Sequence, residues 1–127
     1  MATAFVLYER ATTPDRSAPD VVVVSYLQAL LVKRDQNRAM FFTCGDQMPA
    51  IEAFQNQILV KEKELGVSIS VNIENLVVSE SGPSDAIVDA VIRRSAQVDG
   101  VQQSLTDNWR FELSEHEGWR ICAAQPS

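Results

Sequence analysis

The sequence contains one histidine, two cysteines and no long apolar run, and each scarcity excludes a class of protein. Because the single histidine, His116, stands in an exposed-looking turn and neither cysteine has a second metal ligand nearby in the sequence, no metal site is expected. No stretch approaches the roughly 20 apolar residues that a membrane-spanning helix needs. With 11 Lys and Arg against 17 Asp and Glu, the net charge of −6 has the wrong sign for phosphate backbones, so no nucleic acid partner is expected. No cofactor or nucleophile motif is present, and no cofactor is expected.

What remains is the composition of a globular domain, with 127 residues of which 46% are hydrophobic and 22% charged. We expect the domain to span residues 18–127 and residues 1–17 to lie outside it. The apolar run Ala4–Tyr8 lacks the basic region and cleavage site of a signal peptide, and a polar, Pro-containing stretch follows it. Two interpretations stay open: a linker that follows a membrane helix upstream of Met1, or the start of a cytoplasmic protein, either frayed or forming an N-terminal strand.

Helical spacing and capping residues predict the first part of the domain. Ser17 is expected to cap a helix that has Pro19 in its first turn. Asp35 is expected to cap a second, short segment. The first helix carries its apolar side chains at the spacing of one buried stripe: Val23, Tyr26, Leu27, Leu30 and Leu31.

A further helix is predicted from about Pro49 to Leu65. Gly66 marks its end, because glycine readily adopts the left-handed conformation that closes many helices. The residues expected on its buried face are Ile51, Phe54, Ile58 and Leu65.

After Gly66 the hydrophobic period changes to two, which predicts four antiparallel strands. The alternation slips near Glu74-Asn75, and a β-bulge there would bend the sheet. Asp99-Gly100 predicts a type I′ hairpin between the second and third strands. Alternation along the third strand places one set of residues on one face: Val101, Gln103, Leu105, Asp107, Trp109, Phe111 and Leu113.

The segment Tyr-Leu-Gln-Ala-Leu from Tyr26, the following Asp35, and the final Gly118–Cys122 resemble the nuclear transport factor 2-like superfamily. The resemblance implies an α+β cone, in which N-terminal helices pack on a strongly bent antiparallel sheet of four or slightly more strands. Within the superfamily, the chain is most similar to domains of actinobacterial envelope proteins. Many of these domains are carried outside a single membrane helix and have cysteines in the same two places.

Cys44 and Cys122, 78 positions apart, could form a disulfide or remain as two buried thiols. The resemblance implies the disulfide, and with it an oxidising compartment. Strict alternation argues against it, because it puts Cys122 on the opposite face from Trp119 and Ile121. Either those two residues face away from the helices, or the last strand is irregular.

Some members of the superfamily are enzymes that use an Asp or His base and a Tyr donor inside the cone. The pocket residues that this implies here are Tyr26, Gln103, Asp107 and Trp109, with Asp107 and Tyr26 as the catalytic pair. The simpler interpretation, which we prefer, is a solvated Asp107 and a core Tyr26. An Asp-Arg-Asp triad of the epoxide-hydrolase kind is not assigned, because the arginines are expected mostly at outward positions: Arg93, Arg94 and Arg110.

The resemblance therefore implies a non-catalytic domain of a membrane-anchored envelope protein, on the extracytoplasmic side of the cell membrane. Such a domain is expected to bind a protein partner or a small apolar ligand, and to form a homodimer through its sheet. The alternative is a small pocket enzyme of the ketosteroid isomerase or polyketide cyclase type.

Overall fold

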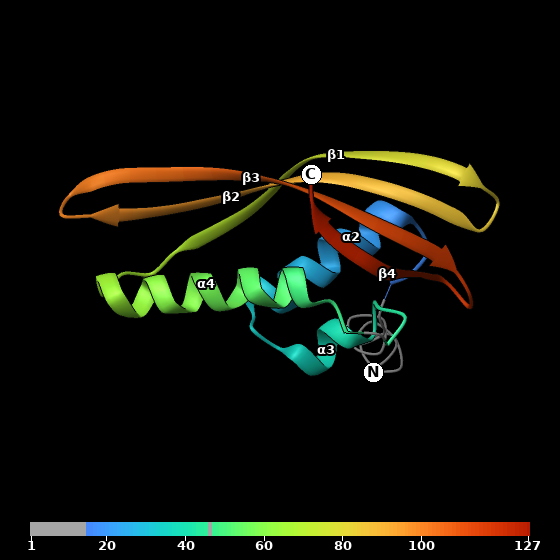
Figure 1. The fold of residues 1–127 in the computed structure, drawn as a ribbon, viewed down its shortest axis with the longest axis horizontal. Helices are drawn as coiled ribbons and strands as arrows, with labels where there is room; N and C mark the ends of the chain where they lie inside the picture. The colour runs from blue at the N-terminus through green and yellow to red at the C-terminus, as the bar shows by residue number, and fades with distance from the viewer. Residues whose placement is uncertain (1–14, 46) are drawn as a thin grey trace, which may run out of the picture.

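A computed structural model describes residues 15–45 and 47–127, which form helices followed by one four-stranded antiparallel sheet (Figure 1). The helices are α2 (Pro19–Leu27), the π-helical η1 (Gln28–Val32) that continues it, α3 (Gln36–Met40) and α4 (Pro49–Leu65). The strands are β1 (Ser70–Gly82), β2 (Asp85–Val98), β3 (Val101–Glu115) and β4 (Trp119–Pro126). Each strand pairs with the next in sequence, and the predicted α+β class is confirmed.

The start of α2 differs from the prediction. Its N-cap is Ala18, and Ser17 makes no cap hydrogen bond. The Ser17 hydroxyl instead donates to the Asp15 carboxylate at 2.6 Å, and its backbone N–H donates to the same oxygen at 3.0 Å. Pro19 nevertheless stands in the first turn. The five residues of the predicted apolar stripe are all buried, so the helix and its buried face were correctly predicted.

The other features predicted for the helices are observed, except for the burial of Leu65. The Asp35 carboxylate accepts a hydrogen bond from the Arg38 backbone N–H at 3.1 Å and caps α3. Gly66 ends α4 with φ of 64°, as expected. Leu65, however, is 50% exposed, because the buried residues of α4 end at Ile58 and its last turns extend past the core.

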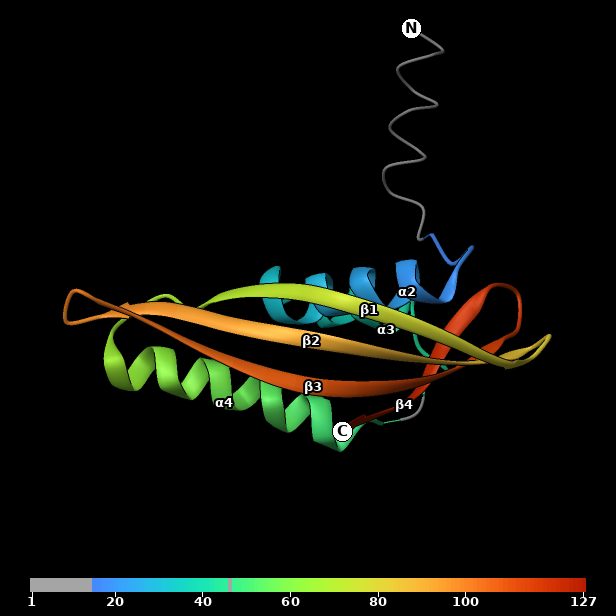
Figure 2. The same ribbon diagram turned by 90° about the horizontal axis from the view of Figure 1, so that it is seen from above.

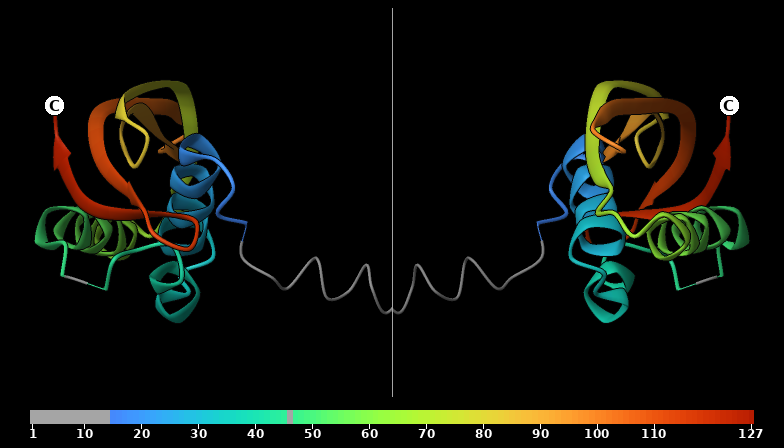
Figure 3. Two further views of the ribbon diagram at one scale, coloured as in Figure 1. Left: turned by 90° about the vertical axis from the view of Figure 1, so that its right-hand side faces the viewer. Right: turned by 90° about the vertical axis from the view of Figure 1, so that its left-hand side faces the viewer.

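Two backbone irregularities shape the sheet where the sequence predicted them. The β1–β2 register shifts between Glu74 and Val77, and Asn75 has φ of 52°. Asp99 and Gly100 join β2 to β3 with φ of 52° and 78°, the paired positive angles of a type I′ turn. Because a bulge increases strand bending, the sheet curves instead of lying flat, as Figure 3 shows.

The helices lie on one face of the curved sheet, and the main core fills the space between them (Figures 1 and 2). The largest fully buried side chains of this core come from both layers: Val22, Val23, Leu27, Phe42, Ile51, Ile58, Val88, Ile92, Phe111 and Ile121. The opposite face of the sheet carries both apolar and charged side chains. It carries ion pairs between Arg110 and Asp89 at 2.9 Å and between Arg93 and Glu74 at 3.3 Å.

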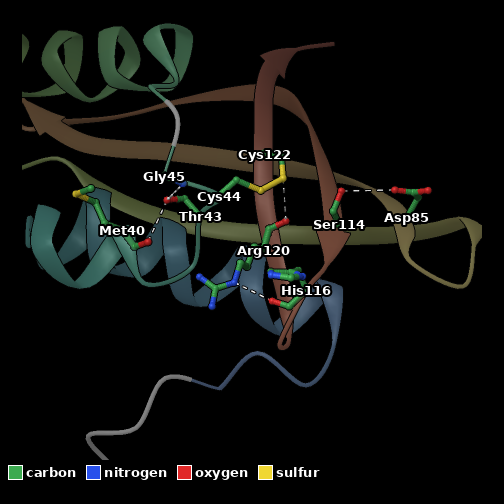
Figure 4. The surroundings of a disulfide bond; sticks show 9 residues. All are labelled: Met40, Thr43, Cys44, Gly45, Asp85, Ser114, His116, Arg120 and Cys122. Atoms are coloured by element: carbon green, nitrogen blue, oxygen red, sulfur yellow. Dashed lines mark hydrogen bonds between the residues drawn. A yellow bond between two sulfur atoms is a disulfide. The ribbon is translucent and has the colours of Figure 1, made fainter.

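A disulfide joins Cys44 to Cys122 beside the last strand (Figure 4). In β4, Ile121 pairs with Leu113 and Ala123 pairs with Glu112, so Cys122 is the extra residue of a bulge. Trp119 and Ile121 are buried on the helix side, so they do not face away from the helices. The irregularity of the last strand therefore explains how Cys122 can reach Cys44. The predicted disulfide is confirmed.

Candidate functional site

The register of the β2–β3 hairpin decides which side chains point toward the helices. Ala90 pairs with Trp109, and Arg94 pairs with Leu105. Because paired residues share a face and side chains alternate, Arg94 lies on the helix side of the sheet. The expected outward position is therefore wrong for Arg94, while Arg93 and Arg110 do lie on the outer face and pair with Glu74 and Asp89 there.

Phe54 of α4 links the helix to this inner face. Its ring centroid lies 5.3 Å from that of Trp109, with the two planes inclined by 57°. The Arg94 guanidinium carbon lies 5.0 Å from the centroid of the same Phe54 ring. A cation at this distance from an aromatic ring is attracted by the electron-rich face. Trp109, Phe54 and Arg94 thus form one continuous contact series from the core to the surface.

Asp107 completes this group by binding Arg94. The Nε and Nη2 atoms of Arg94 donate to the two carboxylate oxygens of Asp107 at 2.9 and 3.3 Å. The side chains are 18% and 30% exposed, so the pair stands at the edge of the core. Since both carboxylate oxygens accept from the guanidinium, Asp107 is held as an ion-pair partner rather than presented as a free base.

A cleft of about 380 Å³ opens beside this group, between the first half of α4 and β3. Its volume lies within the usual range for ligand pockets, roughly 300–1,000 Å³. The walls combine aromatic, small and polar side chains: Ala53, Phe54, Gln57, Thr106, Asp107 and Trp109. The cleft can therefore accommodate an apolar group against the rings and a polar group against Gln57 or Asp107.

Comparisons with known proteins identify the architecture. No protein-family model and no curated protein matches the sequence. Among solved structures, Aln2 from a Streptomyces species is 12% identical, with a TM-score of 0.60 over 89% of this chain and 93% of that one. A protein described as an aromatic ring hydroxylase from Novosphingobium aromaticivorans is 15% identical, with a TM-score of 0.59 over 89% and 87%.

A ketosteroid isomerase-like protein from Erwinia carotovora atroseptica is 15% identical, with a TM-score of 0.51 over 83% of this chain and 88% of that one. The chain has the nuclear transport factor 2-like fold. At these identities the likeness shows the fold alone, and the resemblance inferred from Tyr26–Leu30, Asp35 and Gly118–Cys122 is confirmed at that level. Any activity must be argued from the residues of this chain.

The nuclear transport factor 2-like cone extends beyond its helices at one end. Figures 1 and 2 both show the tip of the β2–β3 hairpin running past the end of α4. On the inner face of this hairpin, Val101 is 59% exposed and Leu105 is 62% exposed. We call this surface the hairpin shelf, and define it by four residues: Val98, Val101, Gln103 and Leu105. Val101 and Leu105 remain exposed to water although they lie on the helix side of the sheet.

The four predicted pocket residues of this nuclear transport factor 2-like domain lie in three places. Asp107 and Trp109 line the cleft, and Trp109 is only 3% exposed. Gln103 is exposed on the hairpin shelf. Tyr26 lines a different pocket, formed by the helices. The structure therefore does not bring Asp107 and Tyr26 into one cavity as an isomerase-type pair would require.

Two residues of the site, Phe54 and Arg94, were not predicted from the sequence. Phe54 was assigned to the core alone, and Arg94 was placed outward. The inward position of Arg94 could have been predicted from the alternation of β2. Arg94 continues the every-second-residue series Val88, Ala90 and Ile92, which are buried on one face. Apolar residues at both parities in the first half of β2 concealed that pattern.

Within residues 15–45 and 47–127, no three or more His, Cys, Asp or Glu side chains gather as a metal site. None of the helices in this part of the chain has the length and apolar character to cross a membrane.

Proposed function

We propose that this chain is a non-catalytic binding domain, which holds a small apolar ligand or an apolar segment of a protein partner across the cleft and the hairpin shelf. The observation that carries the proposal is the exposure of Leu105, 62%, on the inner face of the sheet. It continues the face that bears Trp109, and its cross-strand neighbour is Arg94. Aromatic, cationic and apolar groups thus follow one another along a single surface.

The energetics favour an occupant that covers this surface. Full burial of a Val or Leu side chain contributes roughly 1.5–3 kcal/mol relative to exposure in water. Val101 and Leu105 are both more than half exposed, so much of that free energy is still to be gained. The Arg94–Asp107 pair beside them is already satisfied, which leaves apolar contact as the main attraction.

The proposal also includes a location on the extracytoplasmic side of a cell membrane, within a membrane-anchored protein. The disulfide between Cys44 and Cys122 supports it, because disulfides persist in oxidising compartments and are rare in the cytosol. A homodimer through the sheet remains a prediction.

A neutral fluorescent dye, Nile red, tests the binding surface. Leu105→Lys should weaken dye binding by at least about tenfold, because it places a charge in the apolar contact. Val77→Lys is the matched control, since Val77 is 57% exposed but pairs with the outward-facing Asp89. Equal losses in both variants, or no loss in Leu105→Lys, would contradict the proposal.

A photo-crosslinking amino acid tests for a protein occupant in cells that express the full-length protein. Placed at Leu105, it should give a discrete adduct that the same group at Val77 does not give. If dye binding depends on Leu105 but no specific adduct forms, the occupant is a small ligand.

The compartment is tested separately by quenching cells in acid and alkylating with a polymer-linked maleimide, without reductant. A disulfide in cells leaves Cys44 and Cys122 unmodified, and two adducts per chain would contradict the extracytoplasmic location. Protease digestion of intact spheroplasts should cleave the domain if it lies outside the membrane.

A further inference from the structure

A second cavity lies among the helices. It has a volume of about 240 Å³, and all of its described lining residues belong to helices or to the connection between α3 and α4. Tyr26 of α2 and Glu52 of α4 both contribute to its wall. Because none of the four described strands lines this pocket, it is separate from the cleft between α4 and the sheet.

Tyr26 presents a hydroxyl group that is available to a ligand. The side chain is 3% exposed, yet its hydroxyl makes no hydrogen bond with any residue in the described part of the chain. Burial, reinforced by the negative charge of Glu52, raises the pKa of the Tyr26 phenol, which therefore stays protonated at neutral pH. A neutral hydroxyl can both donate and accept a hydrogen bond.

The other polar groups in the wall are partly engaged. The Thr43 hydroxyl donates to the Met40 carbonyl at 3.0 Å and accepts from the Gly45 backbone N–H at 3.2 Å. The Gln36 amide donates to Gln55, which leaves the Gln36 carbonyl oxygen free to accept. Oxygen acceptors thus remain available inside the pocket.

Charge restricts the class of ligand. Among the described residues of the wall, Glu52 is the one charged side chain, and it forms no ion pair with another described residue. No lysine or arginine of the described chain lines the cavity to neutralise an anion. A carboxylate or phosphate would therefore be repelled, whereas an ammonium group would form a charge-assisted hydrogen bond with Glu52.

Size and the remaining lining restrict it further. The volume lies below the usual range for drug-sized ligands, roughly 300–1,000 Å³. Leu30, Met40 and Met48 supply apolar surface, and methionine side chains adapt to irregular shapes. We propose that this interhelical pocket binds a small primary amine with a short apolar tail, whose ammonium group contacts Glu52 and Tyr26.

The disulfide bears on this site through the chain that forms one wall. Cys44 lies between Thr43 and Gly45, which both line the pocket. The backbone N–H of Cys44 donates to the Ile121 carbonyl at 2.9 Å, and the disulfide ties the same residue to β4 (Figure 4). Reduction should therefore weaken amine binding without altering any residue that contacts the ligand.

Three probes of matched shape test the proposal on the disulfide-bonded chain by two-dimensional ¹H–¹⁵N NMR titration: 2-phenylethylamine, 2-phenylethanol and phenylacetate. The amine should bind at least about tenfold more tightly than the alcohol, since a hydrogen bond to a charged group contributes roughly 1.5–3 kcal/mol. Phenylacetate should not bind at the pocket. Amine-induced shifts should centre on Tyr26, Thr43 and Met48.

Glu52→Gln should remove the preference for the amine, lowering its affinity about tenfold, and circular dichroism should show an unchanged fold because Glu52 is exposed. Glu64→Gln on the same helix is the control and should leave binding unchanged. The proposal is overturned by equal affinities for amine and alcohol, by shifts centred on Phe54 and Trp109, or by no saturable binding of the amine. Tyr26→Phe should weaken binding less than Glu52→Gln, because it removes a neutral group.

Discussion

Cys122 occupies the bulge of β4 and is bonded to Cys44, whose backbone N–H donates to the carbonyl of Ile121, the residue before Cys122. The two Cα atoms lie 4.9 Å apart. The bulge turns Cys122 to this side of the strand while Ile121 remains in the core. The bond therefore connects the segment after α3 to the last strand of the sheet without removing an apolar side chain from the interior.

Removal of this disulfide should lower the free energy of unfolding by roughly 4 kcal/mol, because the bond closes a separation of 78 residues in the unfolded chain. The change is the double substitution Cys44→Ser and Cys122→Ser, measured by urea unfolding. Reductant should destabilise the native chain by a similar amount and leave the double variant unaffected. A native chain insensitive to reductant would contradict this prediction.

Gly118→Ala should destabilise the domain by about 1–3 kcal/mol. Gly118 has φ of 100°, and a Cβ atom there would lie 2.8 Å from the Cβ atom of Arg16. Gly82→Ala is the matched control, since Gly82 lacks a positive φ and has nothing within 4 Å of an added Cβ. Thermal unfolding of the two variants measures the difference, and equal stabilities would show that the contact with Arg16 is easily relieved.

The Arg94–Asp107 pair should show a coupling free energy of about 1 kcal/mol in a double-mutant cycle built from Arg94→Met and Asp107→Asn. The outer pair of Arg110 with Asp89 has the same distances, 2.9 and 3.3 Å, but more exposed side chains. Solvent screens such pairs, so its cycle should give a smaller coupling. Equal couplings in the two cycles would mean that the position of Arg94 over Phe54 adds nothing.

Glu62 should make the stability of the domain depend on acidity. Burial alone would raise its pKa, but hydrogen bonds from the Ile69 backbone N–H and from Arg34 outweigh burial and lower it from the usual 4.5. A carboxyl whose pKa is lower in the folded state stabilises it above the unfolded pKa, and this contribution is lost as the pH falls through the folded pKa.

Chemical unfolding of the native chain and of Glu62→Gln from pH 7 to pH 3 measures this effect. The native chain should be the more stable near pH 7, and the difference should shrink as the pH falls below 4.5. Glu64→Gln is the control, because the Glu64 side chain is 56% exposed and forms a surface ion pair with Lys61. A difference that stays constant with pH would contradict the assignment.

Much of the fold could be predicted because its signals are local. The cap at Asp35, the left-handed Gly66 and the Asp99-Gly100 turn each depend on backbone geometry within a few residues. The slip in alternation at Glu74-Asn75 likewise reports the bulge directly. The predicted cap at Ser17 is absent because the helix begins one residue later, with Ala18 at the N-cap position.

The site could be predicted only in part, because it depends on contacts between distant segments. Asp107 and Trp109 follow from the alternation of β3, and both line the cleft. Their neighbour Phe54 comes from α4, and the position of Arg94 depends on which face of β2 the helices cover. Tyr26 was grouped with Asp107, although packing of the helices gives it a pocket of its own.

The sequence by itself determined the order of the elements, their ends and the bend of the sheet, since neighbouring residues decide these through hydrogen bonds and allowed backbone angles. The tertiary structure alone decided that Arg94 binds Asp107, that Leu105 remains in water and that Cys122 reaches Cys44. These three outcomes depend on which parts of the β2–β3 hairpin the helices cover and on a bulge in β4, features that arise only when segments far apart in the chain pack together.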